Sequence, residues 1–352
     1  MTRVARFRWQ RWLPALAVAS VWASALVPVF IPTSAMAQAS AASTDDAHAW
    51  LQRMHTAANS GNYRGTLVFS AGGTMSSSRV WHYRVGDQTY EKLESQDGRQ
   101  RQIVRHNDDV HTLWPQSRVA VIEKRDALPG WQVTPQRVDP RALDQYQVQR
   151  EGPSRVAGRD ADVLLLLPND QLRYPQRLWA DRATGLMLRA EVLSLGSERQ
   201  VLESAAFSEV EIGIRPQPKV VMAAAARTEG FRVVRPKQES VKLEDEGWTQ
   251  AQTVAGFKLK GCVKRELDAA QGSAASTVPA NPVLQAVFSD GLAQVSIFIE
   301  PFDAQRHKQE MQAHLGATST VTLRRQVHWF TAVGDAPPGT LRLLAESLVR
   351  RR

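Results

Sequence analysis

The stretch that decides the fold in the second half of this 352-residue chain is Leu284-Gln-Ala-Val-Phe-Ser-Asp-Gly-Leu-Ala-Gln-Val-Ser-Ile-Phe-Ile-Glu-Pro-Phe302. Its middle, Ser289-Asp290-Gly291, has the composition of a turn, because Asp hydrogen-bonds nearby backbone groups and Gly accepts a positive φ. After the turn, period-two spacing puts four apolar side chains on one strand face: Ala293, Val295, Ile297 and Ile299. The stretch therefore predicts a β-hairpin with one apolar face, ended by Pro301.

A hairpin of this kind can simply belong to a core. This hairpin also resembles the signature hairpin of the RseB/MucB family, through the segments Phe288-Ser-Asp-Gly-Leu and Val295-Ser-Ile-Phe-Ile-Glu300. Members of that family are periplasmic regulators of the sigma-E envelope stress response. Further on, Val327-His-Trp-Phe-Thr-Ala-Val-Gly-Asp-Ala-Pro337 is similar to the family's closing strand and turn, with Asp335 where the family tends to have Glu.

Residues 1–37 have the pattern of a secretory signal peptide. Four arginines precede a long apolar stretch, and Ala35-Met36-Ala37 is a small-x-small cleavage site before Gln38. An uncleaved membrane anchor is the alternative, because the apolar stretch is nearly long enough to cross a bilayer. The prolines within and after that stretch favour cleavage. We therefore expect an exported protein in the periplasm, with no nucleic acid as its partner.

The net charge of +9 is unevenly distributed along the chain. Residues 38–215 carry 22 basic and 22 acidic side chains, whereas the chain from 216 onward carries 18 basic and 13 acidic ones. A basic C-terminal half favours an anionic partner. Period-two spacing predicts that three lysines of one strand share a face, with an arginine at its end, and these are the partner-binding candidates: Lys258, Lys260, Lys264 and Arg265. They also fit a merely solvated face. The single cysteine, Cys262, is interpreted as a small structural residue.

The first domain is expected over residues 38–215. A helix that begins at Thr44 or Asp45 and ends at Gly61 precedes many short strands separated by tight turns, which predicts an antiparallel meander. Leu178-Trp-Ala-Asp-Arg-Ala-Thr-Gly-Leu-Met-Leu-Arg189 resembles the LolA/LolB lipoprotein carriers, and this resemblance implies a LolA-like half-barrel wrapped on the helix. An open half-barrel would leave a lipid groove, although the same residues could fill a core. The groove candidates are Trp50, Met54, Leu67, Phe69, Val121, Leu165, Leu167 and Leu188.

Residues 216–246 are interpreted as a linker, and 247–352 as a C-terminal anti-sigma-factor-binding domain. The pattern predicts a smaller antiparallel sheet with helices over Phe302–His314 and after Pro337. The fold class expected for the whole chain is mostly β, of the α+β kind.

Motifs for catalysis are missing from the sequence. There is no Gly-x-Ser-x-Gly elbow, no dinucleotide fingerprint and no His-Glu-x-x-His, so we expect no enzyme, no cofactor and no metal. The family resemblance implies a regulator that binds the periplasmic segment of a transmembrane anti-sigma factor of RseA/MucA type and shields it from site-1 proteolysis.

The same resemblance implies an acylated ligand, a lipid or lipoprotein, as the stress signal that the regulator senses. A periplasmic carrier of LolA/LolB type is the alternative, which the second domain disfavours because simple carriers lack it. The sequence leaves open whether the protein forms a homo-oligomer.

Overall fold

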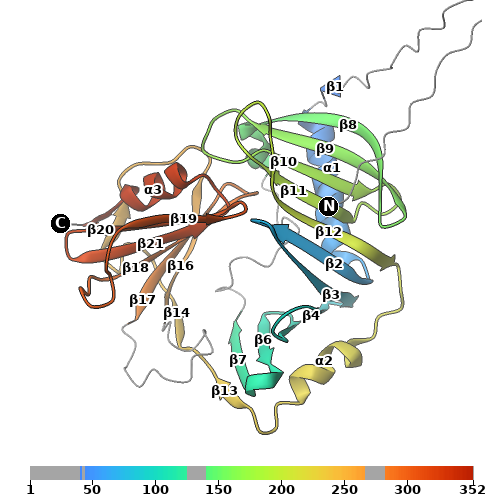
Figure 1. The fold of residues 1–352 in the computed structure, drawn as a ribbon, viewed down its shortest axis with the longest axis horizontal. Coiled ribbons are helices and arrows are strands. Elements are labelled where there is room, and N and C mark those ends of the chain that lie inside the picture. The colour runs from blue at the N-terminus through green and yellow to red at the C-terminus, as the bar shows by residue number, and fades with distance from the viewer. Residues whose placement is uncertain (1–39, 42–43, 125–139, 266–281, 352) are drawn as a thin grey trace, which may run out of the picture. The chain divides into compact units, whose positions relative to one another are not determined.

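The protein is described here from a computed structural model, which covers residues 40–41, 44–124, 140–265 and 282–351. Most of these residues form two separate β-sheets, the large sheet and the small sheet (Figure 1). Both sheets belong to one compact unit, and the predicted signal peptide lies outside the described residues. The expected fold class, mostly β with a large antiparallel sheet and a smaller C-terminal sheet, is confirmed.

The large sheet has thirteen strands, all antiparallel to their neighbours except at one edge, where β13 runs parallel to β7. Their spatial order is β1 (Ser40–Ala41), β8 (Tyr146–Val156), β9 (Arg159–Pro168), β10 (Gln176–Asp181), β11 (Met187–Leu193), β12 (Val201–Ile212), β2 (Tyr63–Ala71), β3 (Thr74–Val85), β4 (Gln88–Ser95), β5 (Gln102–His106), β6 (Asp109–Trp114), β7 (Val119–Lys124) and β13 (Arg232–Val234). The predicted meander is therefore present.

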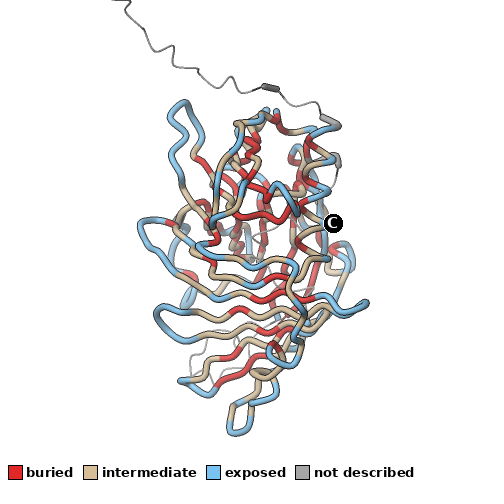
Figure 2. The backbone as a smooth tube through the Cα atoms, turned by 90° about the vertical axis from the view of Figure 1, so that its right-hand side faces the viewer, coloured by how far each residue is buried: buried red, intermediate tan, exposed pale blue. Residues whose placement is uncertain are grey.

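Two helices cover opposite faces of the large sheet. Helix α1 (Thr44–Ser60) packs through Ala57 near Val80 of β3, whereas α2 (Pro218–Ala226) packs through Val221 against Trp81, the next residue of that strand. Since successive side chains of a strand point to opposite faces, the two helices lie on opposite sides. Figure 2 shows buried and intermediate residues along the strands, with exposed residues gathered mainly at the turns. Short 3-10 helices follow β6 (Pro115–Ser117) and precede β8 (Pro140–Gln145).

The small sheet has seven strands around the hairpin predicted from the sequence. Their order is β14 (Gln238–Ser240), β16 (Lys258–Arg265), β17 (Val283–Ser289), β18 (Gln294–Pro301), β21 (His328–Gly334), β20 (Thr318–Arg325) and β19 (Met311–Leu315). The four side chains from Ala293 to Ile299 are all buried in one core, as the alternation predicts. Helix α3 (Pro338–Ser347) covers this core, and β15 (Trp248–Gln250) pairs with β22 (Leu348–Arg350).

The predicted helix over Phe302–His314 is wrong. The chain makes a turn at Asp303, whose carbonyl accepts the His307 N–H at 2.8 Å, and then forms the edge strand β19. Most side chains of β19 are exposed, so this segment has no apolar stripe with which a helix could dock. Pairing with β20 satisfies its backbone groups instead.

The predicted linker, residues 216–246, includes one helix and two short strands. It contributes α2 to the large sheet's outer face, β13 to that sheet's edge and β14 to the edge of the small sheet. The domain limits given above remain predictions.

Candidate functional site

The groove candidates from the sequence fall into more than one place. Met54 is buried in an apolar cluster formed by α1, Leu143 of the 3-10 helix before β8, and one face of β8, β9, β10 and β11, which we call the helix cluster. Trp50 packs at its edge. Leu67 and Leu188 belong to a second cluster with Tyr63 and Phe207. The structure therefore brings these four candidates together only in pairs.

The other four candidates differ in exposure and direction. Leu165 and Leu167 alternate with Leu164 and Leu166 of the helix cluster, so they point to the opposite face of β9. Val121 is buried on β7, in neither of these two clusters. Phe69 shares a face of β2 with the buried Leu67 but is 37% exposed, which makes it the candidate most accessible to a ligand.

The basic strand β16 is interrupted by a bulge at Lys260, and the predicted single face of lysines is wrong. Lys258 pairs with Ser289 and Lys264 with Leu284, so the two lysines lie on opposite faces of the sheet. Lys258 and Lys260 are exposed, whereas the Lys264 Nζ lies 3.1 Å from the Glu246 Oε2.

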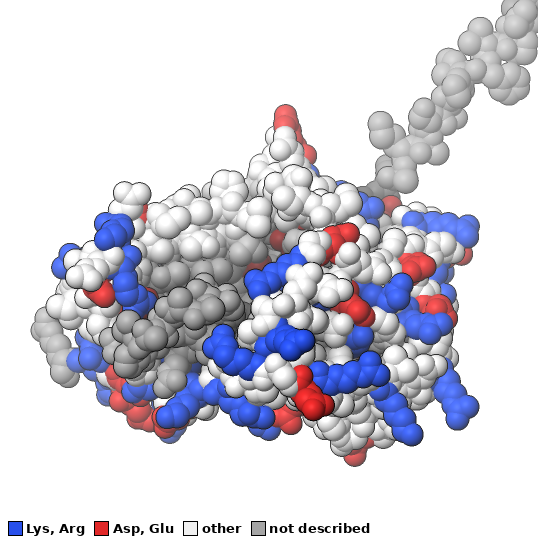
Figure 3. All heavy atoms as spheres, turned by 60° about the horizontal axis from the view of Figure 1, so that its bottom comes forward, with Lys and Arg blue, Asp and Glu red and all other residues white. Residues whose placement is uncertain are grey.

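Arg265, the last candidate on that strand, is only 7% exposed. It donates to the Gln285 Oε1 at 3.2 Å and lies 3.6 Å from the Glu123 Oε2 of the large sheet. Burial raises the pKa of Glu123, and the Arg265 guanidinium opposes that rise. Arg265 therefore joins the two sheets. The view in Figure 3 shows Lys and Arg side chains spread over the surface with Asp and Glu between them, without one continuous basic patch.

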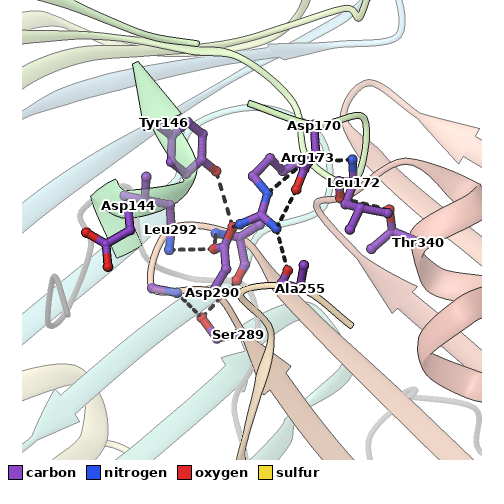
Figure 4. A network of polar contacts seen from close by, with 12 residues as sticks. Asp144, Tyr146, Asp170, Leu172, Arg173, Ala255, Ser289, Asp290, Leu292 and Thr340 are labelled. Atoms are coloured by element: carbon purple, nitrogen blue, oxygen red, sulfur yellow. Dashed lines mark hydrogen bonds and ion pairs between the residues drawn. The ribbon is translucent and has the colours of Figure 1, made fainter. Parts of the chain in front are cut away.

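A buried polar network joins the tip of the β17–β18 hairpin to the large sheet (Figure 4). Within the turn, the Asp290 Oδ1 accepts the backbone N–H groups of Leu292 at 2.9 Å and Ala293 at 2.7 Å. Its Oδ2 accepts the Arg173 guanidinium at 2.9 Å and the Tyr146 hydroxyl at 3.2 Å. Burial, followed by the charge of Asp290, raises the pKa of Tyr146 well above its ordinary value, so the phenol stays protonated and donates.

Arg173 comes from the loop between β9 and β10, and its side chain is fully buried. Besides Asp290, it binds the Asp170 carboxylate at 3.1 and 3.2 Å and donates to the Ala255 carbonyl at 2.5 Å. Gly256 has a φ of +78°, and a Cβ there would lie 2.7 Å from one guanidinium nitrogen, so a larger residue would strain the backbone and require the arginine to shift. A buried charge needs such a complete set of partners to be tolerated.

Apolar side chains cross this contact in both directions. Leu292, from the hairpin turn of the small sheet, packs against the helix cluster of the large sheet. Leu172, beside Arg173 in the large-sheet loop, packs against the core of the small sheet, and its carbonyl accepts the Thr340 hydroxyl at 2.8 Å. Each sheet thus contributes one leucine to the other's apolar cluster.

The sequence did not reveal this network. Ser289-Asp290-Gly291 was interpreted as turn chemistry alone, and Arg173 lies in a loop without periodicity. Asp170 is three residues from Arg173, but that spacing brings side chains together on a helix and not in a loop such as this one. The long-range partner, 117 residues away, has no signature in a single sequence.

The residues that the structure describes contain no group of three or more His, Cys, Asp or Glu side chains that could hold a metal ion. No helix among them is long and apolar enough to cross a membrane. Cys262 is buried, and burial, followed by the charges of Glu246 and Glu244, raises the pKa of its thiol to about 11, so it is not an activated thiolate.

Comparisons with known families match both halves of the chain. The family model for the MucB/RseB N-terminal domain matches residues 46–226, and the model for the MucB/RseB C-terminal domain matches residues 242–349. The two matches together span well over half of the chain.

Similar proteins include regulators with experimental structures. The chain is 32% identical over 311 residues to the sigma factor AlgU regulatory protein MucB of Pseudomonas aeruginosa, which covers 86% of this chain and 90% of that protein. It is 24% identical over 319 residues to the sigma-E factor regulatory protein RseB of Escherichia coli, and the match covers 90% of this chain and 94% of that protein. A structure of the Pseudomonas aeruginosa MucA/MucB complex matches with a TM-score of 0.66 and 29% identity, covering 87% of this chain and 99% of that one.

Proposed function

This chain belongs to the MucB/RseB family of sigma-factor regulatory proteins, and on that premise we propose that it binds the periplasmic segment of a MucA- or RseA-type anti-sigma factor. By holding that segment in the periplasm it acts as a negative regulator of a sigma-E-type stress response. It performs no chemistry on its partner.

The observation that carries this proposal is the extent of the similarity. The match to a chain of the MucA/MucB complex covers 87% of this chain and 99% of that one, which is more than the matched N-terminal domain alone could supply. A carrier that consisted of the large sheet alone would not account for the C-terminal match over residues 242–349. We therefore favour the regulator over the LolA/LolB-type carrier.

Two features support a division of labour between the sheets. The chain from residue 216 onward is basic, and Lys258 and Lys260 of β16 are exposed, which suits an acidic stretch of a peptide partner. The large sheet holds α1 against an apolar cluster and leaves Phe69 accessible, which suits an acyl chain. In this proposal, lipid or lipoprotein binding at the large sheet releases the anti-sigma segment, which until then is shielded from site-1 proteolysis.

A capture experiment tests the proposed partner. The mature protein, residues 38–352, is immobilised and exposed to a detergent extract of the envelope from its own organism, and retained proteins are identified by mass spectrometry. We expect a transmembrane anti-sigma factor among them. Retention of many lipoproteins without any anti-sigma factor would instead support the carrier.

A protease assay tests shielding directly. The periplasmic segment of the captured anti-sigma factor is digested with the site-1 protease in the absence and presence of the protein. We expect the half-life of the segment to lengthen in proportion to the fraction bound. Equal cleavage rates at saturating protein would refute the shielding role and leave the binding result intact.

A further inference from the structure

The small sheet also contacts the large sheet through the turn of the β19–β20 hairpin, residues 315–318, which docks where β2 ends and β12 begins. We call this contact the turn joint. Gly316, within the turn, has a φ of +60°, and a Cβ there would lie 2.7 Å from the Ala71 Cβ and 2.9 Å from the Leu202 carbonyl oxygen. The backbone of the turn therefore lies directly against the large sheet.

Two partly buried carboxyl groups flank this turn, one from each sheet. Glu203 of β12, which lies opposite Ala71 in the large sheet, accepts the backbone N–H of Ala317. Asp335, which follows β21 in the small sheet, accepts the Thr318 hydroxyl at 3.2 Å. The turn thus donates one hydrogen bond to each of the two carboxyl groups.

The charges at the turn joint differ from those at the two ion-paired contacts between the sheets. At those contacts, an arginine of one sheet faces a carboxylate of the other. At the turn joint, burial and then the charge of Asp335 raise the pKa of Glu203, and burial also raises the pKa of Asp335. Because each carboxylate disfavours the ionisation of the other, the pair loses its protons in two coupled steps.

Other ionisable residues that lie close to the turn joint in sequence are at exposed positions. His314 lies on β19, and Glu198 and Arg199 lie in the turn before β12. The β2–β3 turn, residues 71–75, contains no ionisable side chain. Solvent screens exposed charges, so the two partly buried carboxyl groups dominate the electrostatics of the joint.

We propose that the turn joint is a pH-sensitive contact, which is closed while Glu203 and Asp335 hold a proton between them and opens when both are ionised. Opening lets water hydrate the two carboxylates, which relieves their repulsion. The two arginine–carboxylate contacts keep opposite charges together, so the movement is confined to the β19–β20 hairpin, which lifts from the large sheet. Since protons close the joint, it opens as the pH rises, with or without a bound partner.

Hydrogen exchange of the Ala317 amide, followed by NMR on the mature chain, residues 38–352, tests this proposal. The acceptor of that N–H belongs to the opposite sheet, so its protection from exchange reports the joint itself. After correction for the intrinsic rate of exchange, we expect the protection to fall at least about tenfold from pH 5 to pH 8. The amides of Leu292 and Ala293, which Asp290 accepts within its own turn, should keep their protection.

Two variants each remove one charge and keep a side-chain oxygen as an acceptor, Glu203→Gln and Asp335→Asn. We expect Glu203→Gln to abolish the fall in protection and Asp335→Asn to reduce it to about threefold or less. Glu198→Gln is the matched control at an exposed position before β12 and should retain the full effect. Melting curves at pH 5 establish that each variant is folded, and Asp335→Ser replaces Asp335→Asn if the latter is not.

An equally large fall in a folded variant without the Asp335 charge would overturn the proposal, because burial of Glu203 alone would then account for the pH dependence. Constant protection of the Ala317 amide in the unaltered protein would also overturn it. Neither result bears on the capture of an anti-sigma factor, which is measured at one pH, so the proposed function would stand.

Discussion

At the scale of single residues, Asp290 links local and long-range structure. One of its oxygens shapes the hairpin turn and the other holds Arg173 of the large sheet. Substitution of this one carboxylate therefore affects two levels of structure, which is why Asp290→Asn is more informative than Asp290→Ala. Asparagine keeps an oxygen for the turn and loses only the charge.

A second residue at the boundary of the sheets makes stability depend on pH. Burial, and then the nearby carboxylate of Asp335, raise the pKa of Glu203 from 4.5 to about 7, although the Ala317 N–H bond opposes the rise. Between pH 4.5 and about 7, Glu203 therefore keeps a proton in the folded protein that it releases in the unfolded chain. The stability of the protein falls as the pH rises through this range. From pH 5 to pH 8 we expect the free energy of unfolding, measured with urea, to lose about 1 kcal/mol from this group after allowance for solvent screening.

The variant Glu203→Gln isolates this contribution. It resembles the protonated carboxyl, so we expect it to match the unaltered protein at pH 5 and to exceed its stability at pH 8. Glu198→Gln, at an exposed glutamate just before β12, is the control and should keep the original pH slope. An equal slope in the Glu203→Gln protein would show that other groups determine the pH dependence.

At the scale of elements, the bulge at Lys260 decides which cations of β16 face a partner. Lys258 and Lys260 remain exposed, while Arg265 is buried between the sheets. We expect Lys258→Glu with Lys260→Glu to slow association with the anti-sigma segment on the order of tenfold at low salt, since exposed charges act mainly through steering. The difference should shrink at high salt, where screening shortens the range of the charges. Stopped-flow fluorescence measures the association rate at each salt concentration.

A control for this strand has to change the net charge equally. Arg215→Glu with Lys219→Glu does so at exposed positions around the start of α2. We expect the control to leave the association rate nearly unchanged. The same slowing in both double variants would mean that overall charge, and not β16, attracts the partner.

Met54 of α1 is buried and Phe69 of β2 is partly exposed, which predicts different outcomes when each is replaced by aspartate. Met54→Asp places a charge in the helix cluster, where we expect several kcal/mol of destabilisation and loss of the folded state. Phe69→Asp changes a side chain that is 37% exposed, so the protein should stay folded and lose affinity for an acyl probe such as a fluorescent palmitoylated peptide. Thermal melts beside probe titrations distinguish the two. A folded Phe69→Asp protein with undiminished probe binding would remove Phe69 from the lipid groove.

At the scale of the whole molecule, the segment that connects the two sheets contributes one strand to each of them. Strand β13 extends the edge of the large sheet beside β7, and β14 follows four residues later at the edge of the small sheet. Together with the Arg173–Asp290 and Arg265–Glu123 pairs, this gives the sheets several separate connections. We infer that a signal at one sheet reaches the other through these few contacts.

Export is the prediction that concerns the whole chain. We expect cleavage after Ala37, because Ala35 and Ala37 supply the small residues that a signal peptidase requires. Mass spectrometry of the purified periplasmic protein should give an N-terminus at Gln38. Ala37→Leu should block processing and hold the precursor in the membrane fraction. Isolation of the unaltered protein with Met1 still present would contradict the periplasmic assignment.

The sequence by itself determined the local architecture of this protein. Alternation from Ala293 to Ile299, the Ser289-Asp290-Gly291 turn and the helical spacing before Gly61 depend on neighbours within a few residues, and each forms as expected. The motifs of the hairpin and of the closing strand pointed to the family for the same reason. The edge strand β19 was missed because a weak local pattern yielded to pairing with β20.

Only the tertiary structure decided how these elements meet. The bulge at Lys260, the burial of Arg265 and the pairing of Arg173 with Asp290 depend on surfaces brought together from distant parts of the chain. Periodicity records which face of an element is buried, but not which partner covers it or which charge meets another. For that reason the groove candidates were recognised as apolar and yet divided between separate clusters, and the contact between the sheets became visible only in the folded molecule.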